Sequence, residues 1–469
     1  MALIETLTQI VGAGNVLTGG DTAKYGTDWM GHYSAVPLAV VRPGSTDEVS
    51  KLMAAAHSSG TPVVPISGNT GLTGGTFADG ALMLSLERMN KVKEVRPAAR
   101  IAVVEAGVVL DNLHAAADAE GLVFPLTFGA RGSAMIGGAL STNAGGSNVV
   151  RYGSTRGLCL GVEVVLADGR VLNLMSELHK DNSGYDLKDL FIGAEGTLGI
   201  ITGAVVKLFP KPSAYATAMV AAAGVPEALE LLNRLQISTG GTVEAFEFMP
   251  KQYIQAHLEI VEGARAPFDE MYDVNIMVEV AATAPRDAAP NADGSIPVVE
   301  NLSQTLADLL EEGAILDAVV AQNDAQRKAM WKRREDAAEV SRGQGKAVDT
   351  DIAVPTDKVP VFLEKMQAVI AELGPGAHDS LVCHLGDGNL HYSVYPPELT
   401  PEIKDAVTER IEDVVLELGG SFSAEHGIGL SKKPTMARRK DPLAIELMKS
   451  IKTAWDPKGI LNPGKVLPD

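Results

Sequence analysis

The sequence is poor in cysteine and has no long apolar run. Its 469 residues include only Cys159 and Cys383, which excludes a disulfide framework and indicates a reducing compartment. No apolar stretch approaches the roughly 18 residues that span a bilayer, and the start MALIETLTQIVG has no cationic n-region. We therefore expect a cytoplasmic protein, with a peripheral membrane contact left open.

A surplus of positive charge is also missing. The net charge is −19, whereas binding to nucleic acid or anionic lipid requires an extended basic surface. Two nucleotide-binding motifs are absent as well: there is no G-x-x-x-x-G-K-[ST], and no G-x-G-x-x-G follows a first strand, which excludes P-loop and Rossmann proteins. With 46% hydrophobic and 21% charged residues, the chain is nevertheless an ordinary globular protein, and its length predicts two to four domains.

Glycine is concentrated in one stretch. Residues 127–157 contain eight glycines, three arginines and no acid, so they form neither a long helix nor a solvated linker. Glycine lets backbone N–H groups turn inward and lets a ligand approach the main chain. Short polar side chains in the stretch offer donors to phosphate oxygens: Ser141, Thr142, Asn143 and Ser147. These features suit a dinucleotide pyrophosphate, and the alternative is a glycine-rich barrel corner or bulged strand without a ligand.

Two further glycine-rich stretches favour a cofactor site. PVVPISGNTGLTGG (62–75) is a strand that breaks into a glycine turn, and KDNSGYDLKDLFIGAEGTLGIIT (180–202) is a polar helix followed by glycines and a strand. In this order, the three stretches resemble the FAD-binding domain of the p-cresol methylhydroxylase/vanillyl-alcohol oxidase type over residues 35–212. The resemblance implies a first pyrophosphate loop, a main flavin bed and a closing segment.

The three stretches together supply the expected flavin contacts. The FAD should be non-covalent, because the first loop reads SGNT (67–70), without the histidine that tethers flavin in some members of the family. We also expect Asn462 to contact the flavin, because it lies in a tail that resembles the C-terminal strip covering the flavin in this family. The expected FAD-binding residues are Pro65, Ser67, Gly68, Asn69, Thr70, Gly71, Leu72, Gly74, Gly75, Thr127, Gly132, Ser133, Gly137, Gly138, Ser141, Thr142, Asn143, Gly145, Gly146, Tyr152, Gly153, Glu195, Gly196, Gly199, Ile200, Ile201 and Asn462.

The order of predicted elements indicates an α+β protein. We expect a two-subdomain FAD-binding domain over residues 1–212 and an α+β substrate (cap) domain with a large antiparallel sheet over residues 213–420. A C-terminal segment over residues 421–469 should return to the FAD domain. Within the cap domain, the pattern predicts strands at 215–222 and 242–248 and one long helix over 323–342.

The sharpest motif outside the flavin stretches is CHLGDGNLHYSV (383–394). Apolar runs around Gly-Asp-Gly predict a strand, a tight turn and a strand, which would let His384 and His391 face each other. Glu425 in SAEHGIG (423–429) offers a third ligand. Two histidines and one carboxylate leave coordination positions open for a substrate oxygen. The alternative is a pair of satisfied sheet histidines and a surface Glu-His dipeptide.

Together, HxGDGNxH and EHGxG resemble the signature of FAD-linked D-2-hydroxy-acid dehydrogenases, which include enzymes for D-2-hydroxyglutarate and D-lactate and the glycolate oxidase flavin subunit. The resemblance implies that His384, His391 and Glu425 hold a divalent metal, Zn²⁺ first, with Mn²⁺ or Co²⁺ as alternatives. It makes Asn389 a substrate or metal contact and His426 the catalytic base. An ion bound to the α-hydroxyl of the substrate lowers the pKa of that hydroxyl, and a neutral histidine removes its proton. The α-hydrogen then leaves as hydride to FAD.

A basic helix supplies the expected substrate clamp. The family has a W-x-x-R pattern on this helix, which here reads WKRR (331–334) and implies that Arg334 binds the substrate α-carboxylate; a planar guanidinium suits a bidentate carboxylate. The alternative is a solvated helix face with i,i+4 ion pairs.

Two arrangements are open for the residue that binds the second carboxylate of a dicarboxylate substrate. Asp349 stands where D-2-hydroxyglutarate dehydrogenases usually carry a lysine for this group. Either Asp349 faces the pocket and repels a second carboxylate, or it points to solvent and Lys332, Arg333 or Lys346 binds the distal group. We take Lys346 as a substrate-binding candidate.

The expected function is therefore oxidation of a D-2-hydroxy acid, D-2-hydroxyglutarate first, with D-lactate, glycolate or another D-2-hydroxy acid as the alternative. We expect electrons to pass to an electron-transfer flavoprotein, quinone or cytochrome, no nucleic-acid partner, and a homodimer. Two other classes use the same fold: an alkyl-ether-forming enzyme without net redox chemistry, and a carrier or regulatory protein that has lost catalysis.

Overall fold

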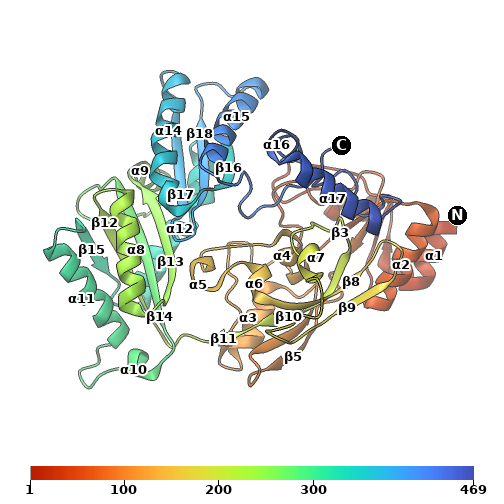
Figure 1. Ribbon diagram of the computed structural model, residues 1–469, viewed down its shortest axis with the longest axis horizontal. Coiled ribbons are helices and arrows are strands. Elements are labelled where there is room, and N and C mark those ends of the chain that lie inside the picture. Colours follow the sequence, from red (N-terminus) through yellow and green to blue (C-terminus); the bar gives the residue numbers. More distant parts are fainter. Residues whose placement is uncertain (1) are drawn as a thin grey trace. The chain divides into compact units, whose positions relative to one another are not determined.

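The computed structural model describes residues 2–469, and the chain forms two compact units. Unit 1 consists of Met1–Gly145, Gly153–Pro210 and Glu425–Asp469, and unit 2 consists of Gly146–Tyr152 and Lys211–Ala424. Figure 1 colours the chain by residue number, so most of unit 2 is green to light blue. The short segment 146–152, expected in the flavin domain, groups with unit 2 instead.

The first sheet of unit 1 is small and mixed. Its order is β1 (Val16–Leu17), β2 (Ala39–Val41), β4 (Leu82–Ser85), β3 (Val63–Ile66), and β2 and β3 run parallel to β4. Helix α2 (Thr46–Ser59) connects β2 to β3. It begins where the Ser45 side chain accepts the Glu48 N–H and ends at Gly60 in the left-handed region (φ 68°).

The second sheet of unit 1 is antiparallel, in the order β5 (Val92–Arg96), β6 (Ile101–Glu105), β10 (Ile200–Lys207), β8 (Cys159–Val165), β9 (Val171–Leu174). An Asp168-Gly169 turn joins β8 to β9, with Gly169 at φ 89°. Strands β7 (Leu122–Val123) and β11 (Phe209–Pro210) pair separately. The helices of this unit are α1 (Ala2–Val11), η1 (Ala13–Asn15), η2 (Gly19–Tyr25), α2, α3 (Leu110–Asp118), α4 (Ile136–Thr142), α6 (Thr155–Leu158), α7 (Lys188–Phe191), α16 (Lys433–Arg439) and α17 (Pro442–Trp455).

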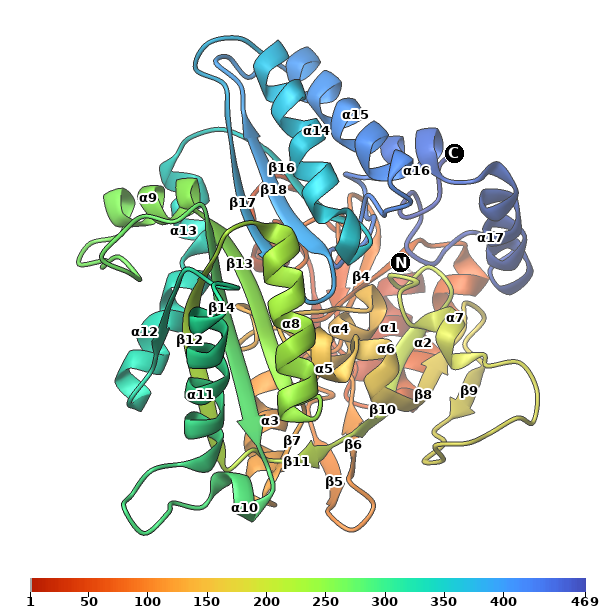
Figure 2. The ribbon, with the colours of Figure 1, turned by 60° about the vertical axis from the view of Figure 1, so that its left-hand side comes forward.

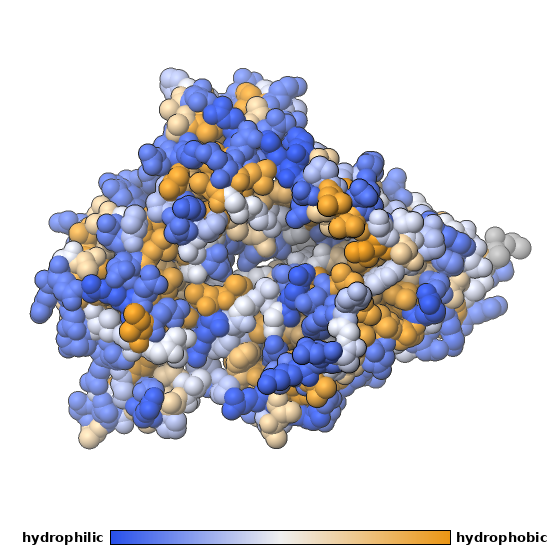
Figure 3. All heavy atoms as spheres, in the orientation of Figure 1, coloured by the Kyte–Doolittle hydropathy of each residue, from blue (hydrophilic) through white to orange (hydrophobic). Residues whose placement is uncertain are grey.

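The C-terminal strip after α17 joins the first sheet. Leu461 forms a parallel bridge with Val63 of β3, and Asn462 donates its backbone N–H to the Val63 carbonyl (2.8 Å). Figure 3 shows apolar side chains among charged ones along α17, where Leu443 and Leu447 are exposed. The tail therefore returns to the glycine-rich loops by forming backbone hydrogen bonds beside the first of them.

Unit 2 is built on one seven-stranded antiparallel sheet. Its order is β15 (Asp317–Val320), β12 (Ala214–Ala222), β14 (Val274–Ala282), β13 (Val243–Pro250), β17 (His378–His384), β18 (Asn389–Tyr395), β16 (Val348–Ala353). This confirms the expected large antiparallel sheet. The helices and turns are α5 (Val149–Tyr152), α8 (Val225–Thr239), α9 (Lys251–Ile260), α10 (Pro285–Ala288), α11 (Pro297–Glu311), α12 (Asp324–Glu335), α13 (Ala337–Gly343), η3 (Thr356–Lys358), α14 (Val359–Glu372) and α15 (Pro401–Glu417).

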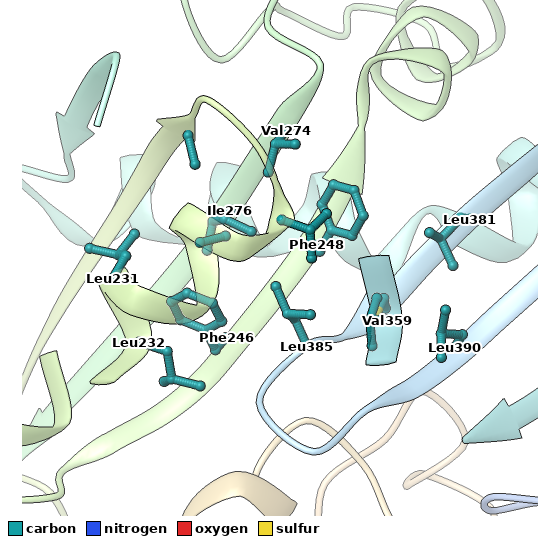
Figure 4. Close-up of a cluster of buried hydrophobic side chains, with 14 of the residues drawn as sticks. Leu231, Leu232, Phe246, Phe248, Val274, Ile276, Val359, Leu381, Leu385 and Leu390 are labelled. Carbon is teal, nitrogen blue, oxygen red and sulfur yellow. The ribbon is translucent and has the colours of Figure 1, made fainter. Parts of the chain in front are cut away.

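The two faces of this sheet differ in character. One face packs against α8, α11, α14 and α15 through a large apolar cluster that includes Phe246, Phe248, Ile276 and Leu390; Figure 4 shows its centre, and Figure 2 shows α8 and α11 along the strands. Because successive side chains alternate between faces, the residues between these lie on the other face. That face carries a smaller apolar cluster with α9, α12 and α13, together with buried polar side chains.

The predicted single helix over 323–342 is wrong in one respect, because it breaks at Asp336 into α12 and α13. Asp336 has φ −70° and ψ 0°, off the helical region. Its carboxylate accepts hydrogen bonds from Lys332 Nζ (2.6 Å) and from the His257 ring (3.0 Å). The break thus lies at a contact with another helix, α9, which a local pattern does not reveal.

Candidate active site

The glycine-rich loops meet in unit 1. The Glu195 N–H donates to the Ser141 carbonyl (2.8 Å), and Asn462 Nδ2 donates to the carbonyls of Glu195 (2.7 Å) and Gly75 (3.1 Å). A Cβ on Gly68 would lie 2.1 Å from the Ser133 carbonyl oxygen, so the first loop and the main bed approach each other backbone to backbone. The structure therefore brings together all three stretches and the C-terminal strip.

These loops fit the pyrophosphate and isoalloxazine of FAD. Asn462 is buried in a left-handed conformation (φ 42°), and its Oδ1 has no hydrogen-bond partner among the described residues. A buried unpaired acceptor is costly unless a bound group donates to it. Some of the remaining expected contacts of unit 1 lie on the elements that border the loops: Pro65 on β3, Gly137, Gly138 and Thr142 on α4, and Ile200 and Ile201 on β10. The others lie between these elements: Ser67, Asn69, Thr70, Gly71, Leu72, Gly74, Thr127, Gly132, Asn143, Gly145, Gly153, Gly196 and Gly199.

Several expected phosphate donors are used inside the protein. The hydroxyls of Ser141 and Thr142 donate to carbonyls four residues earlier in α4, at 2.7 Å and 3.2 Å. In this arrangement they can accept a hydrogen bond but do not offer their protons to phosphate. Tyr152 lies with Gly146 in the segment that belongs to unit 2, and its hydroxyl donates to Glu244 Oε1 (2.5 Å). Tyr152 therefore binds a buried carboxylate of the cap domain, a contact that the sequence did not suggest.

The predicted histidine hairpin is confirmed. Strands β17 and β18 pair with His384 opposite Asn389 and Val382 opposite His391. The two imidazoles lie on the same face as diagonal neighbours, with ring centroids 5.4 Å apart and planes at 80°. Both rings therefore lie on the polar face of the sheet.

A buried carboxylate orients His384. Glu247 on β13 is fully buried, and its two oxygens accept from His384 Nδ1 (2.8 Å) and Arg334 Nε (2.7 Å). Burial alone would raise the pKa of Glu247, but the attraction of His384 and Arg334 lowers it below the ordinary value. Because an ionised carboxylate only accepts, His384 carries a proton on Nδ1. Arg334 Nη2 can only donate, so its contact with Nε2 fits the form of the ring in which Nε2 keeps its lone pair.

This geometry suits a metal ligand. A ligating histidine usually donates its other ring N–H to a carboxylate, which fixes the tautomer. Nε2 of His384 lies 3.3 Å from Arg334 Nη2, so a metal ion on Nε2 would replace that contact. The contacts with Glu247 and His384 involve two of the three guanidinium nitrogens, and Nη1 is in neither. Glu247 thus holds Arg334 through Nε, and Nη2 of the guanidinium group faces His384.

Asp351 is a candidate ligand that the sequence reasoning missed. It is buried on β16 directly opposite His391, and a carboxylate oxygen lies within 4.8 Å of a ring nitrogen of His391. Asn389 Nδ2 donates to Asp351 Oδ1 (3.0 Å), while the buried Oδ1 of Asn389 has no partner within residues 2–469. The alternation of acids at 349 and 351 would have been the signal, since period two places them on one face.

The EHGIG motif begins at the boundary of the two units. Ala424, the last residue of unit 2, donates its N–H to the Asp351 carbonyl (3.2 Å), and Glu425 follows it in the chain. In unit 1, ligand atoms of Glu425 and His426 lie within 4.8 Å of each other. A Cβ on Gly145 would lie 2.5 Å from Glu425 Oε1, so glycine in the flavin bed makes room for this carboxylate.

The basic candidates for a second carboxylate differ in exposure and pairing. Lys346 is exposed, and Lys332 forms an exposed i,i+4 ion pair with Asp336. Arg333 is buried, with 8% of its surface exposed; Nη2 donates to a backbone carbonyl, while Nε and Nη1 have no partner in the part of the chain that the structure describes. Asp349 is exposed and accepts from Ser393 Oγ (2.6 Å).

The chain belongs to the FAD-linked oxidase family. The family model "FAD linked oxidases, C-terminal domain" matches residues 211–466, and the model "FAD binding domain" matches residues 37–175. The first two glycine-rich stretches lie within the FAD-binding match, and the sheet that carries the histidines lies within the C-terminal match. The third stretch, 180–202, lies between the two matches. Within residues 2–469, no helix combines the length and apolar character that crossing a membrane would require.

Curated relatives match along almost the whole chain. The D-2-hydroxyglutarate dehydrogenase of Xanthomonas citri pv. viticola is 36% identical over 452 residues, which is 95% of this chain and 92% of the relative. That of Stutzerimonas stutzeri is 34% identical over 99% of this chain and 98% of its own length. The mitochondrial D-2-hydroxyglutarate dehydrogenase of Bos taurus is 36% identical over 94% of this chain and 79% of the relative.

Solved structures confirm the expected fold. An alkyldihydroxyacetonephosphate synthase matches 99% of this chain and 86% of its own with a TM-score of 0.73 at 18% identity. A p-cresol methylhydroxylase matches 100% of this chain and 96% of its own, also with a TM-score of 0.73, at 17% identity. At this level of identity the likeness concerns the fold.

Proposed function

We propose that the chain is an FAD-dependent dehydrogenase that oxidises D-2-hydroxyglutarate to the corresponding 2-keto acid. The observation that carries the proposal is the buried Glu247–His384–Arg334 network, which holds an imidazole lone pair and a guanidinium fork on one face of the sheet. A 2-hydroxy acid offers a hydroxyl for one and a carboxylate for the other. Relatives of that activity at 34–37% identity support the choice of substrate.

Each protein group has a role in this proposal. Arg334 binds the α-carboxylate through a charge-assisted bond, and Asn389 contacts the substrate or the metal. His426 accepts the hydroxyl proton as general base. The loops of unit 1 would hold FAD, which would supply the acceptor for the α-hydrogen as hydride.

The proposed metal ligands are His384, His391 and Glu425, with Asp351 as a further carboxylate next to His391. A divalent ion, Zn²⁺ first and Mn²⁺ or Co²⁺ as alternatives, would supply Lewis acidity toward the substrate hydroxyl. His391→Ala should abolish turnover and leave the flavin content unchanged, because the ligand lies on the sheet of unit 2. Chelator should inactivate the wild type, and full activity in a preparation shown to be metal-free by elemental analysis would refute the metal assignment.

The decisive test of the function is anaerobic bleaching of the purified yellow protein by a panel of D- and L-2-hydroxy acids. D-2-hydroxyglutarate should reduce the flavin and the L-enantiomer should not. Bleaching by D-lactate alone would move the chain to the alternative substrate. The absence of bleaching by every member of the panel would reject a dehydrogenase altogether.

D-Lactate is the second candidate, and exposed Asp349 is the observation that favours it. Asp349 lies two residues from Asp351 on the same strand, so it is on the face that carries the histidines. If it borders the pocket, Asp349→Lys should raise kcat/KM for D-2-hydroxyglutarate relative to D-lactate. If buried Arg333 binds the distal carboxylate instead, Arg333→Leu should lower kcat/KM for D-2-hydroxyglutarate and leave that for D-lactate unchanged. If Lys346 binds it, Lys346→Ala should have this selective effect.

The electron acceptor is a further part of the proposal. We propose an acceptor other than oxygen, such as an electron-transfer flavoprotein, a quinone or a cytochrome, in a cytoplasmic protein that forms a homodimer. Substrate-dependent reduction of an artificial dye without oxygen consumption would support this part of the proposal, and rapid oxygen consumption would contradict it.

A further inference from the structure

Glu195 occupies a junction in unit 1 that flavin binding alone does not explain. It adopts a left-handed backbone conformation (φ 51°), which is unfavourable for glutamate. Its N–H donates to Ser141 of the main bed, and its carbonyl accepts from Asn462 of the C-terminal strip. The backbone of Glu195 is thus fixed from both sides, and its side chain leaves in a defined direction.

The Glu195 side chain points into the EHGIG turn. Its Oε1 accepts the backbone N–H of Ile428 (2.7 Å), and its Oε2 accepts that of Gly429 (2.9 Å). Burial raises the pKa of Glu195, and these two N–H donors oppose that shift. One carboxylate therefore satisfies two consecutive amides that begin two residues after His426.

Contacts on two sides constrain the EHGIG turn. Gly427 has φ 76°, and a Cβ there would lie 2.7 Å from Glu195 Oε1. On the other side, the Thr73 carbonyl accepts the N–H of Leu430 (2.8 Å), and Thr73 Oγ1 donates to the His426 carbonyl (3.3 Å). The turn is held between the first flavin loop and the closing segment.

We infer that Glu195 is a positioning residue, which fixes the Glu425-His426 turn against the flavin loops so that base and hydride acceptor share one rigid frame. The inference rests on the proposed function, in which His426 removes the hydroxyl proton. Glu195 acts only through backbone amides and does not itself touch the reacting atoms. Its effect should therefore appear in the rate of flavin reduction and not in substrate affinity, because Arg334 belongs to a different unit.

The test is Glu195→Gln. Glutamine has the same size but presents an N–H₂ group to one of the two amides, so one of the two hydrogen bonds is replaced by a donor–donor contact. The expected result is a ten- to hundredfold fall in the rate of anaerobic flavin bleaching, with full FAD content and little change in KM. Hydrogen exchange should show loss of protection at the Ile428 and Gly429 amides.

Glu163→Gln is the matched control. Glu163 is also in unit 1, and its Oε1 accepts two hydroxyls, from Thr46 (2.5 Å) and Thr202 (2.8 Å). The control should bleach at the wild-type rate. If Glu195→Gln does not fold, Thr73→Val removes the hydroxyl contact to the His426 carbonyl on the opposite side of the turn and should also lower the bleaching rate.

The outcomes separate the two claims. An unchanged bleaching rate in Glu195→Gln, or loss of FAD as its main effect, overturns the positioning role while the wild-type substrate panel still stands. A wild type that no 2-hydroxy acid bleaches rejects the proposed function first, before any variant is compared. Restoration of the rate by Glu195→Asp, which keeps the charge, would further support the inference.

Discussion

Replacing Glu247 with glutamine tests both the stability of the cap domain and the metal binding that we propose for His384. In the native protein, the carboxylate neutralises Arg334 and holds the Nδ1 proton of His384, both at 2.7–2.8 Å in a fully buried place. Breaking a buried ion pair by removing one partner costs about 3 to 5 kcal/mol, because the other charge remains buried. Glu247→Gln should therefore lower the free energy of unfolding by about that amount.

The second consequence concerns the tautomer of His384. A glutamine side chain that keeps the Arg334 contact through its oxygen turns its N–H₂ group toward Nδ1. The ring proton then moves to Nε2 and removes the lone pair that we assign to the metal. Loss of such a supporting partner typically costs 10- to 100-fold in metal affinity, or about 1.4 to 2.7 kcal/mol.

The matched control is Glu279→Gln. Glu279 is buried on the same face of the sheet and accepts two hydrogen bonds from Arg327, both at 2.6 Å, but it does not contact a histidine of the hairpin. Both variants should lose similar stability in chemical unfolding, whereas only Glu247→Gln should lose Zn²⁺ affinity in calorimetric titration. Equal metal affinity in the two variants would refute the role given to Glu247.

The contribution of Glu247 to the free energy of unfolding should depend on pH. Because its pKa is below the ordinary value of 4.5 in the folded protein, the stability it contributes is fully present above pH 4.5. It is lost as the pH falls through the folded pKa. The difference in unfolding free energy between the wild type and Glu247→Gln should therefore shrink in acid and be constant near neutrality.

Three other predictions concern the cofactor, the tail and the substrate. Acid precipitation should release all the flavin into the supernatant, since the first loop offers no histidine for a covalent link, and colour on the pellet would contradict non-covalent FAD. Burial lowers the pKa of Lys465 to about 8, whereas the ordinary pKa of lysine is 10.5. Between pH 8 and 10.5 the unfolded chain therefore binds more protons than the folded one, and the wild type should gain stability with rising pH relative to Lys465→Met, as measured by thermal unfolding. Arg334→Ala should weaken kcat/KM for every 2-hydroxy acid alike, by about 2 to 4 kcal/mol for a lost charge-assisted contact; an effect on one substrate only would show that the arginine does not bind the shared α-carboxylate.

The features that the sequence predicted are those encoded locally. Gly-Asp-Gly between two alternating runs is enough to predict the hairpin that brings His384 and His391 together. The three glycine stretches likewise predict loops, and the structure joins them through Asn462. In each case the residues that carry the signal lie within a few positions of the structure that they form.

The features that escaped prediction depend on partners far away in the chain. In the sequence, Glu247 is one of two glutamates in the mainly apolar run VEAFEFMP. Its importance follows from its pairing with His384 on the neighbouring strand, and His384 is 137 positions away in the chain. The break at Asp336 requires His257, and the placement of Tyr152 requires Glu244. A periodicity analysis contains none of these pairings, because each one is set by tertiary packing.

The discontinuity of unit 1 has a consequence for how the protein is made. Its β3 forms a bridge with Leu461, so this part of unit 1 cannot be completed until residue 461 has left the ribosome. The longest continuous piece of unit 2, Lys211–Ala424, is synthesised earlier and contains every strand of its sheet. Since domains fold as units during synthesis, the cap sheet should form before the FAD-binding unit, and FAD should be captured only after the strip around Leu461 has been synthesised.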